Sequence, residues 1–311
     1  MGWLLVVGQA VLLALFAPYL LGVTRAVRAR VEGRGGGRLG QPWRDLRKQL
    51  RKPPTSPADA SIFFTATPPV LMATSLVVAA IAPFVATTSA FGGADLIVVV
   101  GLLLLGTVAL ALGGLDTGTA FGGMGASREM IIAALVEPTL LLAVFALSIR
   151  VGSTDLNTIV AAGALEPSRV FTPASALAAA ALAIATLAES SRIPVDNPAT
   201  HLELTMVHEA MVLEYSGRDL ALVEWASALR LTILLGLLAN LFLPFGVATT
   251  LTPIAVGIGA LAFLVKVSLL GALLAFGEVF AAKLRLFRIP ELLAGSFALS
   301  LLAVLAAAIL G

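Results

Sequence analysis

Long apolar runs alternate with short polar segments along the whole chain. Each run is close to the roughly 20 residues that a helix needs to cross the hydrocarbon core of a bilayer. The pattern therefore predicts an all-α, polytopic membrane protein with about eight transmembrane helices, which we expect to form a single membrane domain over residues 1–311. The predicted spans cover residues 3–24, 62–86, 95–115, 129–150, 172–190, 220–245, 253–280 and 291–310.

A much more polar segment, between Glu189 and Leu222, interrupts this pattern. Within it, Asn197 and Pro198 form a favourable helix start, because an asparagine side chain caps free N–H groups and proline is tolerated at the first helical position. We expect an amphipathic helix at about 199–215 on the cytoplasmic side. It either lines a cavity or lies in the membrane interface with solvated glutamates.

Composition supports the membrane class and limits the chemistry. The hydrophobic fraction is 59% and the mean hydropathy is +1.01. The chain has no cysteine, so it holds no thiolate-ligated iron–sulfur cluster and no disulfide. His201 and His208 lie about 10 Å apart along a helix, too far to share a metal ion. We therefore predict no metal site, and the electrons of any redox reaction must be carried by a partner.

The basic residues are distributed unevenly. Ten of the 20 Lys and Arg residues lie between Arg25 and Lys52, against only two acids, Glu32 and Asp45. Basic loops stay on the cytoplasmic side of a membrane. With eight spans, this rule places both termini outside. Composition alone leaves open whether the Gly-rich stretch at 33–40 is a flexible linker or an ordered loop at the membrane surface.

Several ionisable residues fall inside or beside the predicted spans. Glu137 precedes Pro138, which removes a backbone donor and frees a carbonyl one turn earlier. Lys266 lies near the middle of its span, where we expect an acidic partner. Because charge in a bilayer is costly, such groups are candidates for an ion path, although structural ion pairs or buried neutral acids would give the same pattern. The ion-translocation candidates are Glu137, Glu189, Glu203, Glu209, Glu214, Lys266 and Glu278.

A second set of polar residues lies in the segments between spans. The Gly-rich segment at 116–128 is predicted to be a loop, and its glycines do not follow a strand, so a phosphate-binding loop is not expected. The residues expected to order these segments or to dock partners are Arg30, Gln41, Asp45, Asp116, Arg128, Arg192, Asp196 and Arg218.

Two long motifs carry a resemblance to a known family: GLDTGTAFGGMGASREMIIAALVEP from Gly114 to Pro138, and the polar segment that begins at Glu189. Together they resemble the membrane subunit of group 4 NiFe hydrogenases, of the hydrogenase-4 and formate hydrogenlyase type. That family is homologous to subunit 1 of respiratory complex I, the NADH–quinone oxidoreductase. The stretch from Ile193 to His201 is more similar to the hydrogenase branch.

The resemblance implies a non-catalytic anchor and coupling subunit in a prokaryotic inner membrane. Its partners would be a hydrogenase large subunit, an iron–sulfur small subunit, antiporter-like membrane subunits and the lipid bilayer, with no nucleic acid. The NiFe centre and the iron–sulfur clusters would reside in those partners. Segments 25–52, 116–128 and 190–219 would dock the redox arm, and the acids would begin a path for protons or sodium ions.

Three alternatives remain open. The first is subunit 1 of complex I, with a quinone cavity under the docking platform. The second is an autonomous transporter, which often has repeated halves, and no repeat is evident here. The third is a purely structural anchor.

Overall fold

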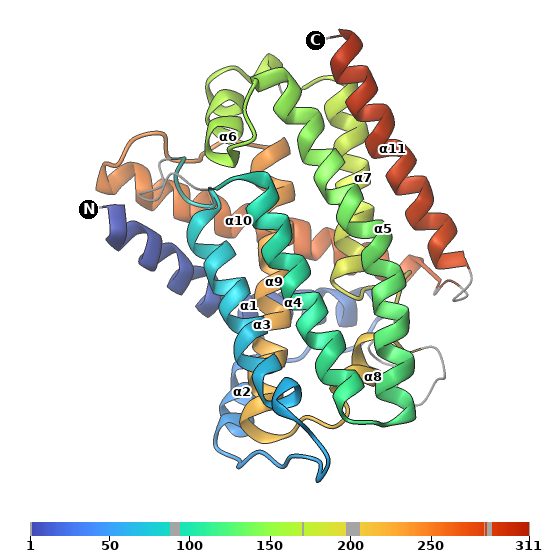
Figure 1. The fold of residues 1–311 in the computed structure, drawn as a ribbon. Coiled ribbons are helices and arrows are strands. Elements are labelled where there is room, and N and C mark those ends of the chain that lie inside the picture. The colour runs from blue at the N-terminus through green and yellow to red at the C-terminus, as the bar shows by residue number, and fades with distance from the viewer. Residues whose placement is uncertain are drawn as a thin grey trace.

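The computed structural model describes residues 2–87, 94–169, 171–196, 206–282, 284 and 288–310. This part of the chain is helical and contains no β-strand (Figure 1). The helices are α1 (Gly2–Val31), α2 (Gln41–Leu50), α3 (Ile62–Ile81), α4 (Leu96–Asp116), α5 (Ala120–Val151), α6 (Leu156–Leu165), the 3-10 turn η1 (Pro167–Arg169), α7 (Pro173–Glu189), α8 (His208–Val212), α9 (Gly217–Phe242), α10 (Pro253–Phe280) and α11 (Ile289–Leu310).

Seven of these helices are long and apolar enough to cross a membrane: α1, α3, α4, α5, α9, α10 and α11. The remaining predicted span, 172–190, corresponds to α7, which has 17 residues and is therefore only about 25 Å long. It begins at the end of the bundle that carries α6 (Figure 1), and its last residue, Glu189, bonds Thr107 and Arg230 near the middle of α4 and α9. The predicted all-α, polytopic fold class is confirmed, with seven helices of spanning length in the described residues and α7 as a shorter apolar helix. We call the end that carries α2 and α8 the basic end.

Side-chain caps fix the starts of most helices. In each case a side-chain oxygen accepts a backbone N–H of the first turn, an interaction whose loss costs about 0.5–2 kcal/mol. The capping residues are Ser61, Asp95, Thr119, Asp155, Thr172 and Thr252. Polar residues at the edges of apolar runs thus define where these six helices begin.

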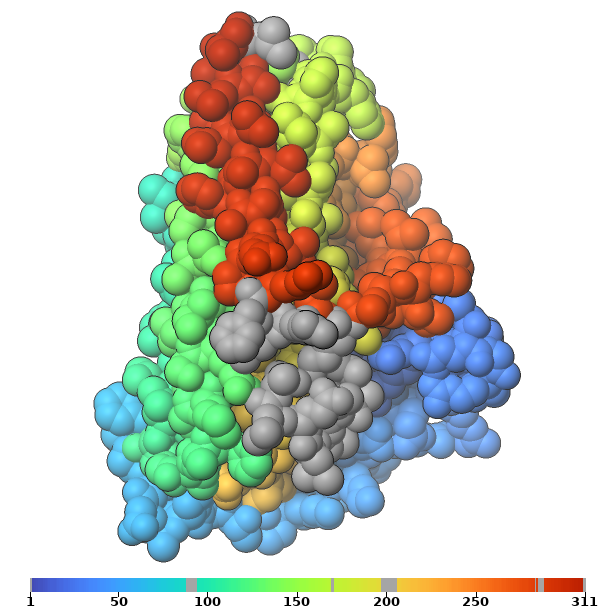
Figure 2. Space-filling model, turned by 90° about the vertical axis from the view of Figure 1, so that its right-hand side faces the viewer, coloured from blue at the N-terminus to red at the C-terminus, as the bar shows by residue number. Residues whose placement is uncertain are grey.

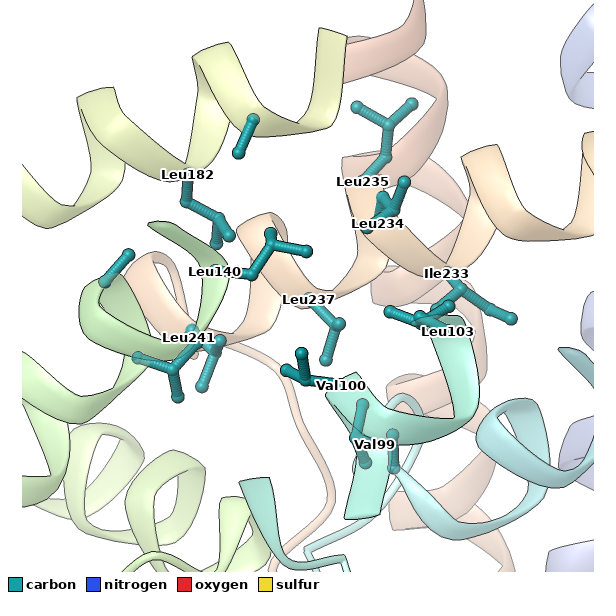
Figure 3. Close-up of a cluster of buried hydrophobic side chains, with 14 of the residues drawn as sticks. Val99, Val100, Leu103, Leu140, Leu182, Ile233, Leu234, Leu235, Leu237 and Leu241 are labelled. Carbon is teal, nitrogen blue, oxygen red and sulfur yellow. The ribbon is translucent and has the colours of Figure 1, made fainter. Parts of the chain in front are cut away.

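Helix α9 forms the centre of the bundle and is the most buried of the seven long helices. Its side chains Ile233, Leu234 and Leu237 pack with residues of α4, α5 and α7, as Figure 3 shows. Helices α10 and α11 are the least buried, and α11 lies on the outer surface over α5 and α7 (Figure 2). Apolar side chains on those two helices are therefore available to lipid or to neighbouring subunits.

Two predicted boundaries were wrong. Helix α1 continues to Val31, beyond the expected end at residue 24, because no glycine or proline occurs between residue 24 and Gly33. Helix α5 begins at Ala120, so the expected loop at 116–128 shrinks to the three residues 117–119. The glycines serve close packing instead: a Cβ at Gly125 would lie 2.8 Å from the Val207 carbonyl oxygen.

The segment between α1 and α2, residues 32–40, is packed rather than free, and we call it the strap. A Cβ on Gly22 of α1 would overlap the carbonyl oxygen of Leu39, and a Cβ on Gly36 would lie 3.2 Å from the carbonyl oxygen of Ala26. The strap therefore runs back along α1. This contact decides between the two interpretations of the Gly-rich stretch in favour of an ordered loop.

The expected amphipathic helix at 199–215 is only partly within the described residues, and its proposed start at Asn197 and Pro198 lies outside them. The described part contains the short helix α8, whose Ala210, Met211 and Val212 are buried, followed by buried Tyr215. Of the two alternatives, this part fits a half-buried element better than a solvated one.

Candidate functional site: a charged cavity at the basic end

A cavity of about 540 Å³ lies at the basic end, lined by residues of α1 to α5 and of α7 to α10. Its lining is unusually rich in ionisable groups for an apolar protein. The acids are Asp45, Glu129, Glu189, Asp196, Glu209, Glu224 and Glu278, and the bases are Arg25, Arg28, Arg192, His208 and Arg230. Charge that is buried in this way must be paired, hydrogen-bonded or used, because an isolated buried ion is costly.

At the inner end of the cavity, Arg230 of α9 forms an ion pair with Glu189 at the end of α7. The same guanidinium donates to the Thr107 hydroxyl at 2.7 Å and to the Leu103 carbonyl at 3.1 Å, and Thr107 is placed 3.0 Å from the Glu189 carboxylate. Gly106 leaves room for the arginine, since a Cβ there would lie 2.7 Å from its Nη1. The buried charges of Arg230 and Glu189 are therefore neutralised by each other and by hydrogen bonds.

Two further acids lie on α5. Glu129 is buried and lines the cavity. Glu137 follows about 12 Å further along the helix and is 6% exposed. Neither carboxylate oxygen of Glu137 has a hydrogen-bond partner among the described residues. It is thus a buried acid just beyond a site whose own charges are satisfied.

At the outer end of the cavity, Glu278 of α10 lies between two arginines. Its carboxylate is 3.4 Å from Arg192 and 3.9 Å from Arg28 of α1. Burial is the main cause that lowers the pKa of Arg192, and Glu278 opposes that shift. The predicted loop residue Arg192 therefore joins the ends of α7, α10 and α1.

Helix α2 covers the same opening. Asp45 lies 3.9 Å from Arg25, and Gln41 donates to Asp45 at 2.9 Å. Gln49 donates to Glu224 of α9 at 3.3 Å. The outer face of α2 is basic and exposed, whereas its inner face completes the cavity wall.

The segment that enters α8 is held by two of the predicted ordering residues. Buried Asp196 accepts the backbone N–H groups of Val207 and His208, both at 3.2 Å. Arg128 of α5 donates to the Met206 carbonyl at 3.0 Å. Burial lowers the pKa of His208, whose ring lies 3.4 Å from the Ser227 hydroxyl.

Two aromatic donors satisfy carbonyls that prolines leave free in neighbouring helices. Pro18 in α1 has no N–H for the Ala14 carbonyl, and the Trp225 indole N–H donates to that oxygen at 2.8 Å. Pro68 in α3 likewise frees the Phe64 carbonyl, which accepts the Tyr215 hydroxyl at 3.1 Å. Such freed groups need a substitute partner in a membrane protein.

Tyr215 also stacks on the Phe64 ring, with centroids 4.2 Å apart, and burial raises its pKa to about 12. The start of α9 and the segment before it therefore clamp the proline-interrupted helices that form two walls of the cavity.

Other predicted residues lie away from the cavity. Asp116 accepts N–H groups of Ser61 at 2.7 Å and Phe64 at 3.1 Å, and so anchors the start of α3. Arg30, Glu214 and Arg218 are exposed. Glu203 lies outside the described residues.

Lys266 was expected to pair with an acid, but the structure gives it neutral oxygen partners instead. Its ammonium donates to the Asn240 amide oxygen at 2.6 Å and to the Leu243 carbonyl at 3.0 Å. Leu243 is the C-cap of α9, where a cation is favoured by the helix dipole. Lys266 therefore lies beside the C-terminal end of α9. Its position in the middle of α10 did not predict this contact.

Sequence reasoning missed Arg230 and Glu129. Arg230 lies well inside an apolar span. A charged residue at such a position could have been recognised as a candidate from the sequence. Glu129 was missed because it is the first residue of the predicted span 129–150 and was therefore expected at the membrane surface, whereas α5 begins at Ala120 and buries it. No group of three or more His, Cys, Asp or Glu side chains suited to a metal ion occurs in the described part of the chain.

Comparisons with known proteins extend over nearly the whole chain. A family model described as NADH dehydrogenase matches residues 4–309. The chain is 36% identical to hydrogenase-4 component C and 32% identical to formate hydrogenlyase subunit 4, both of Escherichia coli strain K12, over 95% of its own length. These matches cover 92% and 95% of the two relatives.

More distant similarity is found as well. An H-type subunit of the NADH-quinone oxidoreductase of Syntrophobacter fumaroxidans is 33% identical over 74% of this chain and 73% of that protein. A chain in the structure of the membrane-bound sulfane sulfur reductase, an archaeal respiratory membrane complex, superimposes with a TM-score of 0.80. It covers 97% of this chain and 99% of that one at 19% identity, which shows the fold alone.

Proposed function

Because the chain belongs to the NADH dehydrogenase family, we propose that it is the anchor and coupling subunit of a membrane-bound, formate hydrogenlyase-like NiFe hydrogenase complex. It docks the redox arm and links electron transfer to the translocation of protons or sodium ions. The hydrogenase branch is supported by the two relatives that match over 92% and 95% of their length, against 73% for the NADH-quinone oxidoreductase relative.

The observation that carries the coupling role is the unpartnered, buried carboxyl of Glu137 beyond the Arg230–Glu189 pair. Ionisable groups in a membrane interior are costly, and they commonly mark ion pathways. Glu129 and Glu189 line the cavity, and they would connect the basic end to Glu137. The path would begin at the outer groups Glu209 and Glu278, with Glu203, Glu214 and Lys266 as further candidates.

The docking role is supported by the exposed polar surface of the basic end. This end would face the cytoplasm, because basic segments remain on that side, and both termini would then lie outside. The redox arm would contact segments 25–52, 116–128 and 190–219. With no cysteine in the chain, the iron–sulfur clusters and the NiFe centre would be held by the large and small hydrogenase subunits, and antiporter-like subunits would continue the ion path.

The alternative is subunit 1 of complex I, with a quinone in the cavity. The cavity volume of about 540 Å³ favours this alternative, since ligand sites commonly measure 300–1,000 Å³. Its seven acids and five bases disfavour it, since such sites are mostly apolar. Quinone and NADH-binding subunits in the purified complex would decide for this alternative.

Replacing Glu137 by glutamine tests the coupling role. We expect E137Q complexes to assemble and retain hydrogenase activity with artificial electron donors, but to lose ion pumping in proteoliposomes. The matched control is E291Q, which makes the same change at an exposed position and should pump normally. Normal pumping by E137Q would instead support a purely structural anchor.

A further inference from the structure

The exposed face of α1 forms an apolar stripe. Val11, Leu15 and Tyr19 are 49%, 53% and 40% exposed, and their spacing of four residues keeps them on one side of the helix. Two further turns of the same face are formed by Gly22 and Ala26. The stripe suits the acyl chains of a lipid.

The strap covers this face where the stripe ends. Leu39 lies against Gly22, and Gly36 lies against Ala26, so the strap runs antiparallel to α1. Arg25 is the first charged residue of α1, so the apolar part of the helix ends at this level, and the strap lies at the depth of the lipid headgroups. A lipid that follows the stripe would therefore meet the strap with its phosphate.

The charge at this point is strongly positive. The end of α1 and the strap carry five arginines, Arg25, Arg28, Arg30, Arg34 and Arg38, against the single acid Glu32. Glu32 pairs with Arg28 and Arg34, and Asp45 of α2 lies 3.9 Å from Arg25. Arg30 and Arg38 are exposed, and no ion pair joins either of them to a carboxylate in the described ranges.

We propose that Arg30 and Arg38, together with the apolar stripe of α1, form a binding site for an anionic phospholipid, with the diester phosphate at the strap. Basic clusters next to a transmembrane helix attract anionic lipids. An acidic protein segment would match the charge but would leave the stripe uncovered. The site is separate from the cavity and does not depend on the coupling role proposed above. Within segment 25–52 it leaves α2, rather than the strap, to contact the redox arm.

The test uses the complex that contains this chain, reconstituted in phosphatidylcholine nanodiscs with a trace of spin-labelled phosphatidylglycerol or spin-labelled phosphatidylcholine. The wild-type complex should immobilise more of the anionic probe than of the neutral one. R30Q/R38Q should lower the relative association of the anionic probe roughly fivefold for each removed charge. R30K/R38K keeps the charge and should retain the preference.

The matched control is R47Q/K48Q, which removes two exposed charges from α2 and should leave the preference unchanged. An equal loss in this control would overturn the proposal, because the attraction would then be diffuse. Displacement of the probe by free glycerol phosphate would also overturn it in favour of a soluble anion. Loss of the co-purifying subunits from R30Q/R38Q with the lipid preference intact would assign the strap to a protein partner.

Discussion

The two acids Glu189 and Glu137 lie in the same interior but have opposite surroundings. Glu189 has an arginine partner and a threonine hydroxyl within 3.0 Å. Glu137 is equally buried, yet neither of its oxygens is bonded within the described structure. A supported ion pair can act as a fixed structural anchor, whereas an unsupported acid adds cost without adding a bond. The contrast separates an acid whose removal should lower stability from one whose burial adds no bond to the fold.

The largest effect should follow from removing one member of the supported pair. R230M leaves the Glu189 charge buried without a partner, which should cost about 3–5 kcal/mol. The melting temperature and yield of the detergent-solubilised complex would measure this loss. The double variant E189Q/R230M removes both charges and should recover much of the stability. A single variant as stable as the wild type would show that the pair is no anchor.

An intermediate effect is expected where α9 contacts α1, beside the same cavity. W225F removes the donor to the Ala14 carbonyl, and an unsatisfied buried carbonyl costs about 1–3 kcal/mol. P18A restores an N–H at the position that normally serves Ala14, so P18A/W225F should melt closer to the wild type than W225F does. If the second change brings no recovery, the indole is not compensating for the proline.

A smaller effect is expected at Glu137. E137Q keeps the shape and breaks no hydrogen bond of the described structure, so the stability should change by less than about 1 kcal/mol. E189Q makes the same chemical change but leaves Arg230 unpaired, and should cost several times more. Parallel thermal melts of the two variants compare the sites directly. Equal losses would remove the distinction drawn between them.

The smallest effect concerns pH. Burial lowers the pKa of His208 in the folded protein, so below about pH 6.5 the unfolded chain binds a proton that the folded chain resists. Stability from this residue is therefore complete above that pH and falls as the pH decreases. H208Q should flatten the decline in melting temperature between about pH 7 and 5. A decline that is the same with and without His208 would assign it to the surrounding acids.

Most of the fold could be predicted from sequence, because long apolar runs at membrane-spanning length have few alternatives. The family resemblance drawn from the two motifs is confirmed by the full-length matches. The helix ends were less accurate. Gly122 and Gly125 suggested a loop, but they lie in α5 where neighbouring backbones approach too closely for a side chain. Glycine in a membrane helix serves packing as often as flexibility.

The site was predicted only in part, for a different reason. The sequence shows which groups are costly to bury, such as Glu137, but not which groups meet. Arg230 and Glu189 are 41 positions apart, and Lys266 meets Asn240 because of how α10 crosses α9. Which side chains meet depends on the positions and angles at which the helices cross. The hydrophobic periodicity of the sequence does not specify these.

The short length of α7 has one further consequence. Glu189, its last residue, lies opposite the middle of α4 and α9, at Thr107 and Arg230. Water and polar groups that reach Glu189 have thus already passed about half of the apolar thickness of roughly 30 Å that the lipid-facing helices cross. On the proposed ion path, the insulating layer at this subunit would be thinner than the bilayer itself, and the remaining distance would begin at Glu137.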